Sequence, residues 1–447
     1  MKLVMDTGDA ASIEDAEKLL SRYAVRVHFG RAGARSRAMQ AALLTVIVTG
    51  RRALPGGVFI EGDFDVPLSV PFAGYATLGE AAKALGARAG EAEDYSLPLI
   101  VFGEGLPLCA KAPIAVRCLT AGWRGGVVPA DSDHKLLPGD DIALAGILAG
   151  ALAVSEVFQH LRGGFAQAGR RGIGQSLWAP DATNWLAEIT GEPALEFLPN
   201  DLWLIGLGHL GQAYLWSLGF LPYVDRADLR LFLQDFDTLD VANESTSVLT
   251  NQTMRHQSKT RAMAHWAERQ GFRTALIERV FGENIKVQDH EPAVALCGVD
   301  NPSARSALED AGFSWVIDAG LGAGVSEYLN MRLYSFPGPR LAKEIWGKAR
   351  RHPRVLPLDK PAYKALKDAG LDECGLTLLA ERTVGAPFVG VVAATQVIGE
   401  VLRCLHGGRP VLAMDATLRS FDDRIVVMGE AGSRPNLGFS QAARGKA

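Results

Sequence analysis

Short apolar runs recur along this chain, each bounded by glycine, proline or charged residues, and longer apolar stretches lie between some of them. Short runs of this kind are typical of buried strands, and longer ones of helices. We predict strands at 24–29, 57–61, 98–102, 114–118, 202–205, 229–233 and 293–299, and a closing strand pair within 416–428. We predict helices at 12–22 with Ser12 as the cap, at 39–48 and at 142–154. This succession indicates an α/β fold.

One stretch organises the rest of the chain. The strand predicted at 202–205 is followed by Gly206, Gly208 and Gly211 in G-x-G-x-x-G spacing, and a helical stretch begins there. Glycine permits the tight turn and lets backbone N–H groups approach a phosphate at the helix N-terminus. The sequence therefore predicts a nucleotide-binding turn, but this signature alone does not separate dehydrogenases from other nucleotide-binding proteins.

The residues after the turn argue against a dehydrogenase. The strand at 229–233 runs into Asp235 and Asp237, which form a D-x-D, and Asn243 follows. Lys259 then stands at the start of a predicted helix, where the helix dipole favours an acid. A dehydrogenase needs one acid for the ribose and would leave the second acid and the lysine idle.

A third apolar strand ends in another acid. The run at 293–299 is followed by Asp300 and Asn301, with Arg305 about one helical turn later. Ligands of open α/β sheets bind at the carboxyl ends of strands, and Mg²⁺ prefers carboxylate oxygens. Asp300 is therefore placed to hold a metal ion, or alternatively to cap the helix that follows.

This ordered series resembles the ThiF/MoeB adenylyltransferases and the ubiquitin-activating enzymes built from them. Their motifs run from the glycine turn through D-x-D, an asparagine and a lysine to D-N-x-x-x-R, and the resemblance covers about 202–408. It is closest to the bacterial ubiquitin-activating-enzyme-like proteins of operons that also encode a ubiquitin-like protein, a conjugating enzyme and a deconjugating peptidase. It implies ThiF-type, Rossmann-like domains, ATP and Mg²⁺ as cofactors, and a role in antiviral defence.

The resemblance also implies a role for each candidate residue. The glycine turn and Lys259 would contact phosphates, Asp235 and Asp237 would hold the ribose, and Asp300 would hold Mg²⁺. The nucleotide-binding set would be Gly206, Gly208, Gly211, Asp235, Asp237, Asn243, Lys259, Asp300 and Asn301. Arg305 would orient the loop.

The chain departs from the family pattern at one position. Where the family has an arginine three residues after the asparagine, this chain has Thr246. A phosphate-contacting cation is therefore missing there. The departure is compatible with a low adenylation activity. The cations that we consider as replacements are Arg255, Arg261, Arg31, Arg35 and Arg37, and the sequence does not choose among them.

An internal repeat predicts what the first part of the chain is. Two helical segments that end in Gly-Gly match at a constant separation of 244 residues, in three pairs: Gly146 and Gly390, Glu156 and Glu400, Gly164 and Gly408. The repeat predicts two tandem adenylation-like domains, or else two merely similar core helices. We find no G-x-G-x-x-G and no later lysine in the first part, and we expect it to lack the D-x-D as well. The first domain would then be degenerate and inactive.

The predicted division has three parts with an insertion in the last. It is an inactive adenylation-like domain at 1–165, a connector at 166–194 with a short helix at 184–189, and an ATP-binding adenylation domain at 195–447. The resemblance places a crossover and cysteine segment within the last domain, at about 325–375. Within this segment, Cys374 occupies the position of the superfamily's reactive thiol. Asp372 and Glu373 oppose a thiolate, so we expect a nearby cation, Lys367 or Arg382.

Composition narrows the partners. The net charge is −4 and the isoelectric point about 6.2, so nucleic acid is not expected as a partner. The longest apolar run, 142–154, has 13 residues and is too short to span a bilayer, so we read it as a core helix and expect no membrane partner. The five cysteines include no C-x-x-C, so no zinc is expected. The N-terminus lacks the apolar core of a signal peptide, and we expect a cytoplasmic protein.

These observations lead to one main hypothesis and two alternatives. In the main one the chain adenylates the C-terminal glycine of a ubiquitin-like protein with ATP and then transfers it to Cys374 as a thioester, with a conjugating enzyme as the next partner. One alternative is an adenylyltransferase for sulfur transfer or peptide modification without a thioester. The other is a non-catalytic nucleotide-binding scaffold, for which Thr246 is the best argument.

Overall fold

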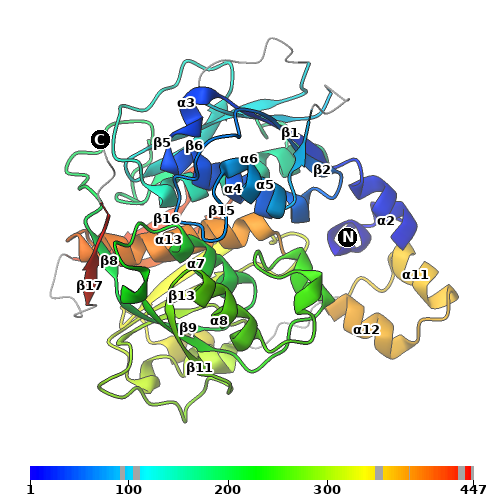
Figure 1. Ribbon diagram of the computed structural model, residues 1–447. Coiled ribbons are helices and arrows are strands. Elements are labelled where there is room, and N and C mark those ends of the chain that lie inside the picture. The colour runs from blue at the N-terminus through cyan, green and yellow to red at the C-terminus, as the bar shows by residue number, and fades with distance from the viewer. Residues whose placement is uncertain (91–95, 104–110, 348–355, 382, 431–437, 444–447) are drawn as a thin grey trace.

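The protein is built from two halves, each centred on one sheet (Figure 1). The computed structural model describes the whole chain except residues 91–95, 104–110, 348–355, 382, 431–437 and 444–447. The first sheet has the strand order β3-β2-β1-β4-β5-β6-β7. Its strands are β1 (Ala24–Phe29), β2 (Gly57–Gly62), β3 (Arg88–Ala89), β4 (Leu99–Phe102), β5 (Ala115–Ala121), β6 (Arg124–Pro129) and β7 (Ile173–Ser176).

The second sheet repeats this order and adds one strand. Its order is β11-β10-β9-β12-β13-β14-β15-β16. Its strands are β9 (Asp201–Ile205), β10 (Arg230–Gln234), β11 (Arg273–Ile277), β12 (Val294–Cys297), β13 (Trp315–Leu321), β14 (Asn330–Phe336), β15 (Val411–Thr417) and β16 (Ile425–Met428). In both sheets the first five strands of the order are parallel and the rest are antiparallel. A further small sheet pairs β8 (Phe197–Pro199) with β17 (Phe439–Gln441).

Helices cover the sheets and form the layer between them. Those of the first half are α1 (Lys2–Thr7), α2 (Ile13–Leu20), α3 (Arg31–Ala34), α4 (Arg37–Ala53), α5 (Leu78–Ala84) and α6 (Ala143–Arg162). Those of the second half are α7 (His209–Gly219), α8 (Lys259–Arg269), α9 (Pro302–Ser306), α10 (Ala342–Trp346), α11 (Pro361–Asp368), α12 (Glu373–Glu381) and α13 (Pro387–Leu405). In Figure 1, α4, α6, α7 and α13 lie between the two sheets.

The interface between the halves is part of one continuous apolar core. Residues from α4, α6, α7 and α13 belong to the same buried cluster. The Trp216 indole of α7 donates to the Thr45 hydroxyl of α4 at 3.0 Å, and Phe72 stacks on Phe220. Buried apolar area stabilises by roughly 25 cal/mol per Å², so a shared core of this kind holds the two halves together.

The two helices of the repeat, α6 and α13, have the same structural role in their halves. The Glu156 carboxylate on α6 accepts the Gly169 N–H at 2.7 Å, and the Glu400 carboxylate on α13 accepts the Val411 N–H at 2.9 Å. Each buried acid thus ties its helix to the chain segment that follows the helix. This shared contact explains why an acid stands at the same place in both copies.

Several predicted elements agree with the structure and others need correction. The strand at 24–29 and the Ser12 cap are confirmed. The core helix predicted from the apolar run 142–154 is confirmed as α6, and its end at Gly163 agrees with the Gly-Gly stop of the repeat. Both α6 and α13 are long and apolar enough to cross a membrane, but 89% of each apolar window is buried inside the protein, which makes them core helices.

The regions predicted to be irregular contain unexpected strands. β7 pairs with β6, so the first sheet extends beyond residue 165 into the predicted connector. The helix expected at 184–189 is absent, since this stretch forms only turns. β14 lies within the segment predicted to be the crossover and cysteine region, and it is a central strand of the second sheet.

Candidate active site

The glycine turn lies between β9 and α7, and each glycine has a different reason to be there. Gly206 has φ 86°, a left-handed conformation that favours glycine. A Cβ on Gly211 would lie 2.0 Å from the Gly206 carbonyl oxygen, so a side chain there is excluded by the backbone. Around Gly208, which caps α7, a Cβ would meet no atom within 4 Å. The turn therefore leaves open space where a phosphate can approach the helix N-terminus.

Asp235 fixes this turn from the neighbouring strand. Its carboxylate accepts the Leu207 N–H at 2.7 Å and the N–H groups of Phe236 and Asp237 at 2.8 and 2.9 Å. Because β10 lies beside β9, the end of β10 and the glycine turn meet at one sheet edge. In this structure Asp235 is a support of the loop, and Asp237 is the more exposed acid of the pair, with 49% of its side chain accessible.

Lys259 joins the acid pair from the start of α8. Its Nζ donates to the Asp237 carboxylate at 2.8 Å and lies 4.0 Å from Asp235. The Lys259 backbone N–H donates to the Asp237 carbonyl at 3.0 Å. The lysine is thus held beside the glycine turn, with its side chain only slightly exposed. Two of the sequence-predicted site features are therefore in direct contact.

Asp300 and its neighbours form the edge of the next strand, β12. Asp300 is exposed, and no hydrogen-bond or ion-pair partner of its side chain is found in the part of the chain that the structure describes. The Asn301 side chain caps α9 by accepting the Ser303 N–H at 2.9 Å. Arg305 donates to the carbonyls of Val299 and Ala319, each at 2.7 Å, which holds the loop that presents Asp300.

Asn243 is engaged in local structure. It lies in the helical turn Val241–Ser245, where its side-chain oxygen accepts the Asp240 N–H at 2.9 Å. The Asp240 carboxylate in turn accepts the Asn243 N–H at 3.2 Å. The reciprocal pair fixes this turn, which follows β10 and leads to Thr246.

Three of the arginines considered as replacements for the missing family cation have acidic partners, namely Arg255, Arg261 and Arg31. Arg255 pairs with Glu244. Arg261 pairs with Glu278 at 2.9 Å, and this contact, with hydrogen bonds from Ser258 and Thr260, lowers the pKa of Glu278 to about 2. Arg31, Arg35 and Arg37 lie at or near the starts of α3 and α4, and no contact of theirs with the Thr246 segment is found among the described residues.

The structure instead shows a different arginine pair near this segment, which the sequence analysis did not consider. Arg52, at the end of α4, donates to the Thr250 carbonyl of the second half at 2.7 Å. Its neighbour Arg51 donates to the Leu85 carbonyl at 3.2 Å. Burial lowers the pKa of Arg52 to about 9, so keeping this guanidinium charged costs desolvation free energy. Within the described residues, no carboxylate lies within 4.0 Å of the guanidinium of Arg51 or Arg52. In the sequence, the only sign of this pair was that two consecutive arginines stand at the end of an apolar helix.

His209, inside the glycine signature, was also missed. A Cβ added to Gly390 of α13 would lie 2.3 Å from its Nε2, and one added to Gly385 would lie 2.9 Å from the Thr246 methyl and 3.6 Å from the His209 Nδ1. Burial lowers the pKa of His209 to about 4, so the ring is neutral at pH 7. His209 therefore links the glycine turn to the chain segment that leads into α13.

Cys374 lies in the first turn of α12 and is exposed. Asp372 accepts the Gly375 N–H at 2.6 Å and so caps this helix. Lys367 is 3.3 Å from Glu373, so this expected cation has its own acidic partner, and Arg382 lies outside the described residues. The predicted crossover and cysteine segment thus presents Cys374 at the start of a short helix.

The other cysteines have the surroundings of packing residues. Cys118, Cys297 and Cys404 are buried, and burial raises the pKa of the thiols of Cys118 and Cys297. Buried thiols with raised pKa values are poor nucleophiles. Cys109 lies outside the described residues. Among the described cysteines, Cys374 is therefore the one that a second protein can reach.

The first half carries a counterpart of the acid pair, contrary to our expectation. Asp63-Phe64-Asp65 follows β2 just as Asp235-Phe236-Asp237 follows β10, so the expected absence of a D-x-D was wrong. The surroundings differ, however. Phe64 stacks on Phe29 at the end of β1, with ring centroids 5.8 Å apart, and Asp63 lies 3.5 Å from the exposed Arg31.

The residues at the edge of the second sheet fit ATP with a divalent ion. Open space at Gly208, an ammonium at Lys259 and an exposed carboxylate at Asp300 come from adjacent elements. In the described residues no cluster of three or more His, Cys, Asp or Glu side chains is placed to hold a metal. Mg²⁺ commonly takes one or two carboxylates and completes its shell with phosphate and water, so one carboxylate is compatible with it.

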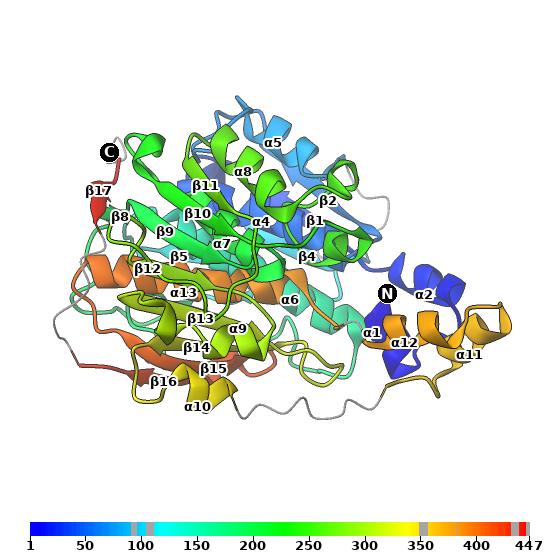
Figure 2. The ribbon, with the colours of Figure 1, turned by 90° about the horizontal axis from the view of Figure 1, so that it is seen from below.

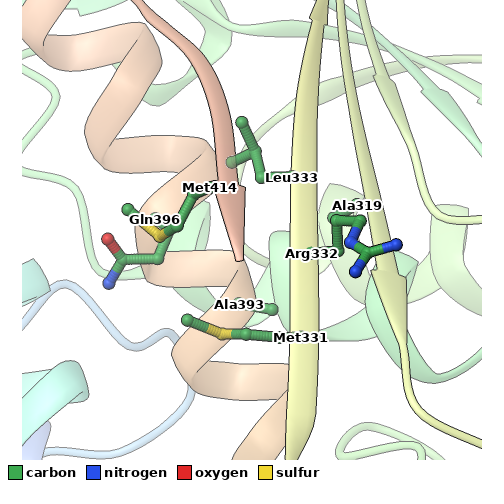
Figure 3. Close-up of a pocket in the computed structure, with 7 residues that line it drawn as sticks. All are labelled: Ala319, Met331, Arg332, Leu333, Ala393, Gln396 and Met414. Carbon is green, nitrogen blue, oxygen red and sulfur yellow. The ribbon is translucent and has the colours of Figure 1, made fainter. Parts of the chain in front are cut away.

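A small cavity elsewhere does not contribute to this site. It lies between α13 and strands β13 to β15, as Figure 3 shows, and its volume is about 10 Å³. A volume near this size holds at most about one water molecule. Its lining is Ala319, Met331, Arg332, Leu333, Ala393, Gln396 and Met414, which includes none of the candidate site residues.

Two solved structures are distantly similar to this chain. E. coli MccB matches with 12% identity and a TM-score of 0.33, over 53% of this chain and 63% of that chain, which is less than two thirds of its length. PaaA matches with 14% identity and a TM-score of 0.33, over 51% of this chain and 72% of that chain. Because both TM-scores are below 0.5, no argument rests on them.

Family models and a curated relative match most of the chain. Residues 24–177 match the family described as the BilD N-terminal domain, and residues 198–408 match the BilD C-terminal domain. The chain is 42% identical over 424 residues to the bacterial E1-like protein BilD of Collimonas sp. (strain OK412), covering 94% of this chain and 92% of that protein. This chain therefore belongs to the BilD family of bacterial E1-like proteins.

Proposed function

We propose that this protein is an adenylyltransferase that activates the C-terminal glycine of a ubiquitin-like protein and passes it to Cys374 as a thioester. The observation that carries the proposal is that the glycine turn after β9, the acid pair after β10 with its partner Lys259, and the loop after β12 that carries Asp300 lie at one edge of the second sheet. The E1-like relative supports a ubiquitin-like partner. A conjugating enzyme would then accept the thioester.

The first step needs positioning and charge more than covalent help. The substrate carboxylate attacks the α-phosphorus of ATP, a P–O bond forms, and pyrophosphate leaves with the electrons of the broken bond. The N–H groups of the glycine turn and the Lys259 ammonium would hold the phosphates, and groups placed in advance in this way stabilise the charge of the transition state. Asp300 would hold Mg²⁺, which supplies further positive charge when bound.

When ATP binds, Lys259 would exchange its partner, from the Asp237 carboxylate to a phosphate. In the structure the lysine lies 2.8 Å from Asp237. A phosphate near the glycine turn would compete for the ammonium and free the Asp237 carboxylate for a ribose hydroxyl. Asp235 would stay with the Leu207 N–H and keep the turn in shape.

The second step needs an accessible nucleophile. The Cys374 thiolate attacks the carbonyl carbon of the acyl adenylate, a C–S bond forms, and AMP leaves as the C–O bond breaks. The proton of the thiol passes to solvent, to which the residue is exposed. Among the described cysteines Cys374 is the exposed one, and the thioester step gives its thiol a role that a scaffold or an adenylyltransferase without a thioester would not.

Pyrophosphate exchange tests the adenylation step. The purified protein with its ubiquitin-like partner should incorporate labelled pyrophosphate into ATP, and the exchange should require Mg²⁺. Asp300→Ala should lower the exchange rate about 10²-fold or more, because it removes the carboxylate that would anchor the metal. Full exchange by Asp300→Ala would rule out the metal assignment.

The thioester is tested separately in the same assay. Cys374→Ala should keep exchange within about twofold but lose the partner adduct that a reducing agent cleaves, because adenylation does not use the thiol. Cys404→Ala is the matched control, since that buried cysteine should affect stability alone. An adduct that persists in Cys374→Ala would place the nucleophile elsewhere. Exchange without any adduct in the native protein would favour the adenylyltransferase without a thioester.

A further inference from the structure

The helix pair that carries Cys374 lies at one edge of the molecule beside the N-terminal helix. Figures 1 and 2 both show α11 and α12 there, next to α1 and α2. On its apolar side the pair belongs to the same buried cluster as α1. The cluster residues from these three helices are Leu3, Val4, Met5, Ala362, Tyr363, Leu376 and Ala380.

A polar network then joins these three helices at one point. The Asp6 side chain on α1 is buried, and its carboxylate accepts the Tyr363 hydroxyl of α11 at 2.6 Å. Lys2, one turn earlier on α1, donates to both Asp6 oxygens at 2.7 and 2.8 Å and to the Tyr363 hydroxyl at 3.0 Å. The same ammonium donates to the Ala380 carbonyl near the end of α12 at 3.2 Å.

This arrangement is unusual for a contact that serves packing alone. A buried carboxylate such as that of Asp6 and a partly buried ammonium such as that of Lys2 are costly to desolvate. Their attraction offsets that cost only when the geometry is good and the remaining lone pairs are satisfied. Apolar residues of the same volume would stabilise the contact at least as well. What the polar network adds is a directional constraint, because it holds only one relative placement of α1, α11 and α12.

We propose that Lys2, Asp6 and Tyr363 are positioning residues for Cys374, a latch through which the first half sets the place of the thiol in the second step. The proposal rests on the proposed function. The thiol stands in the first turn of α12, and the latch holds a carbonyl near the last turn of the same helix. A helix of this length is rigid, so fixing one end fixes where the other end points.

The described segment 383–386, which precedes α13, gives a reason for such precision. A Cβ on Gly385 would lie 2.9 Å from the Thr246 methyl and 3.6 Å from the His209 ring, so this segment contacts the glycine turn. The Val384 N–H donates to the Ala323 carbonyl at 3.1 Å. The segment that follows α12 in sequence is thus held at the nucleotide site, and α12 itself is held against α1 by the latch. A small misplacement of a reacting group lowers the rate steeply.

The test compares three variants of the latch in full-length protein. Tyr363→Phe removes the hydroxyl and leaves the ring in the core. Asp6→Asn removes the charge, and Lys2→Arg keeps the charge and tests for rescue by a similar donor. For Tyr363→Phe and Asp6→Asn, the rate of the reductant-sensitive Cys374 adduct at saturating partner should fall about tenfold, while pyrophosphate exchange and its KM for ATP stay within about twofold. Lys2→Arg should retain most of the adduct rate.

Thr7→Ala provides the matched control on the same helix. Its hydroxyl donates to the Leu3 carbonyl within α1 and contacts Asp9, so the substitution disturbs α1 without removing a latch group. It should leave both exchange and adduct formation unchanged. An adduct rate that is equally low in Thr7→Ala and Tyr363→Phe would show a general loss of α1 and overturn the positioning role.

A second measurement keeps the latch testable whether or not the proposed function holds. Tyr363→Phe should speed amide hydrogen exchange in α11 and α12 and leave α4 unchanged, because the latch holds the helix pair and not the core. Unchanged exchange in α12 together with an unchanged adduct rate would overturn the latch. If the native protein forms no adduct at all, the proposed thioester fails, and faster hydrogen exchange in α12 would still support the latch as the constraint on this helix pair.

Discussion

The two halves of this protein share a framework and differ at the strand ends. Both have the same strand order, and in both a core helix carries a buried glutamate that binds the backbone after the helix. At the ends of β9 and β10, however, a glycine turn leaves open space and Phe236 is 62% exposed. At the ends of β1 and β2, Phe64 lies against Phe29, which lies against Phe102, so the three rings form a cluster there.

This difference shows that different residues determine the framework and the nucleotide site. The buried helices and strands place the ends of the strands at the same positions in each half, whichever residues the loops contain. A nucleotide site then depends on a few loop positions, mainly a glycine turn without side chains and an acid that supports it. In the first half the acid pair is present without a G-x-G-x-x-G turn, and the inactivity of this half stays a prediction.

The strongest test of the comparison changes the matching acids. Asp235→Ala removes the acceptor for three backbone N–H groups, so the glycine turn should shift and pyrophosphate exchange should fall about 10²-fold. Asp63→Ala removes an exposed pair with Arg31, and pairs of this kind contribute about 0–1 kcal/mol. It should therefore leave exchange within about twofold, and a comparable loss in both variants would contradict the division into active and inactive halves.

Most of the framework could be predicted from the sequence, because apolar runs and glycine boundaries directly mark buried elements. The strand at 24–29 and the core helices belong to this class. β14 was missed although Met331 and Leu333 alternate with Arg332 and Tyr334 as in a half-buried strand, because the resemblance assigned this stretch to the crossover and cysteine segment. The strand β7 was missed because Gly174 and Gln175 give it no apolar run.

The site was predictable where its chemistry is local in sequence. The glycine turn, Asp235 and Lys259 meet because their strands are neighbours, which the βαβ order implies. The contacts of Arg52 with Thr250 and of Lys2 with Tyr363 join residues far apart in the chain. No periodicity or spacing encodes such pairs, so only the packing of one half on the other reveals them.

The next test uses the glycines of the repeated helices. A Cβ on Gly146 would lie 1.9 Å from the Ala38 carbonyl oxygen, whereas a Cβ on Gly390 would meet the His209 ring at 2.3 Å. Backbone cannot yield as a side chain can, so Gly146→Ala should destabilise by about 2 kcal/mol and Gly390→Ala by about 1 kcal/mol. Denaturant unfolding measures both. Gly390→Ala should in addition raise the KM for ATP, because it displaces His209 within the glycine turn.

The last test concerns the contact through which the first half reaches the nucleotide side of the second. Arg52 donates to the Thr250 carbonyl, near the position where Thr246 replaces the family arginine, and its charge has no carboxylate partner within 4.0 Å among the described residues. Arg52→Ala should raise the KM for ATP about tenfold, which corresponds to about 1.4 kcal/mol of lost binding. Thr246→Arg in that background should restore part of the affinity, since it returns a cation to the same segment.

Arg51→Ala is the control for this last prediction. Its guanidinium donates to the Leu85 carbonyl of the first half, so its loss should change stability slightly and leave the KM for ATP within about twofold. If Arg52→Ala lowers stability without raising the KM, the arginine is a structural tie between the halves. In that case Thr246→Arg should have no restoring effect, and the first half would influence the nucleotide site through packing alone.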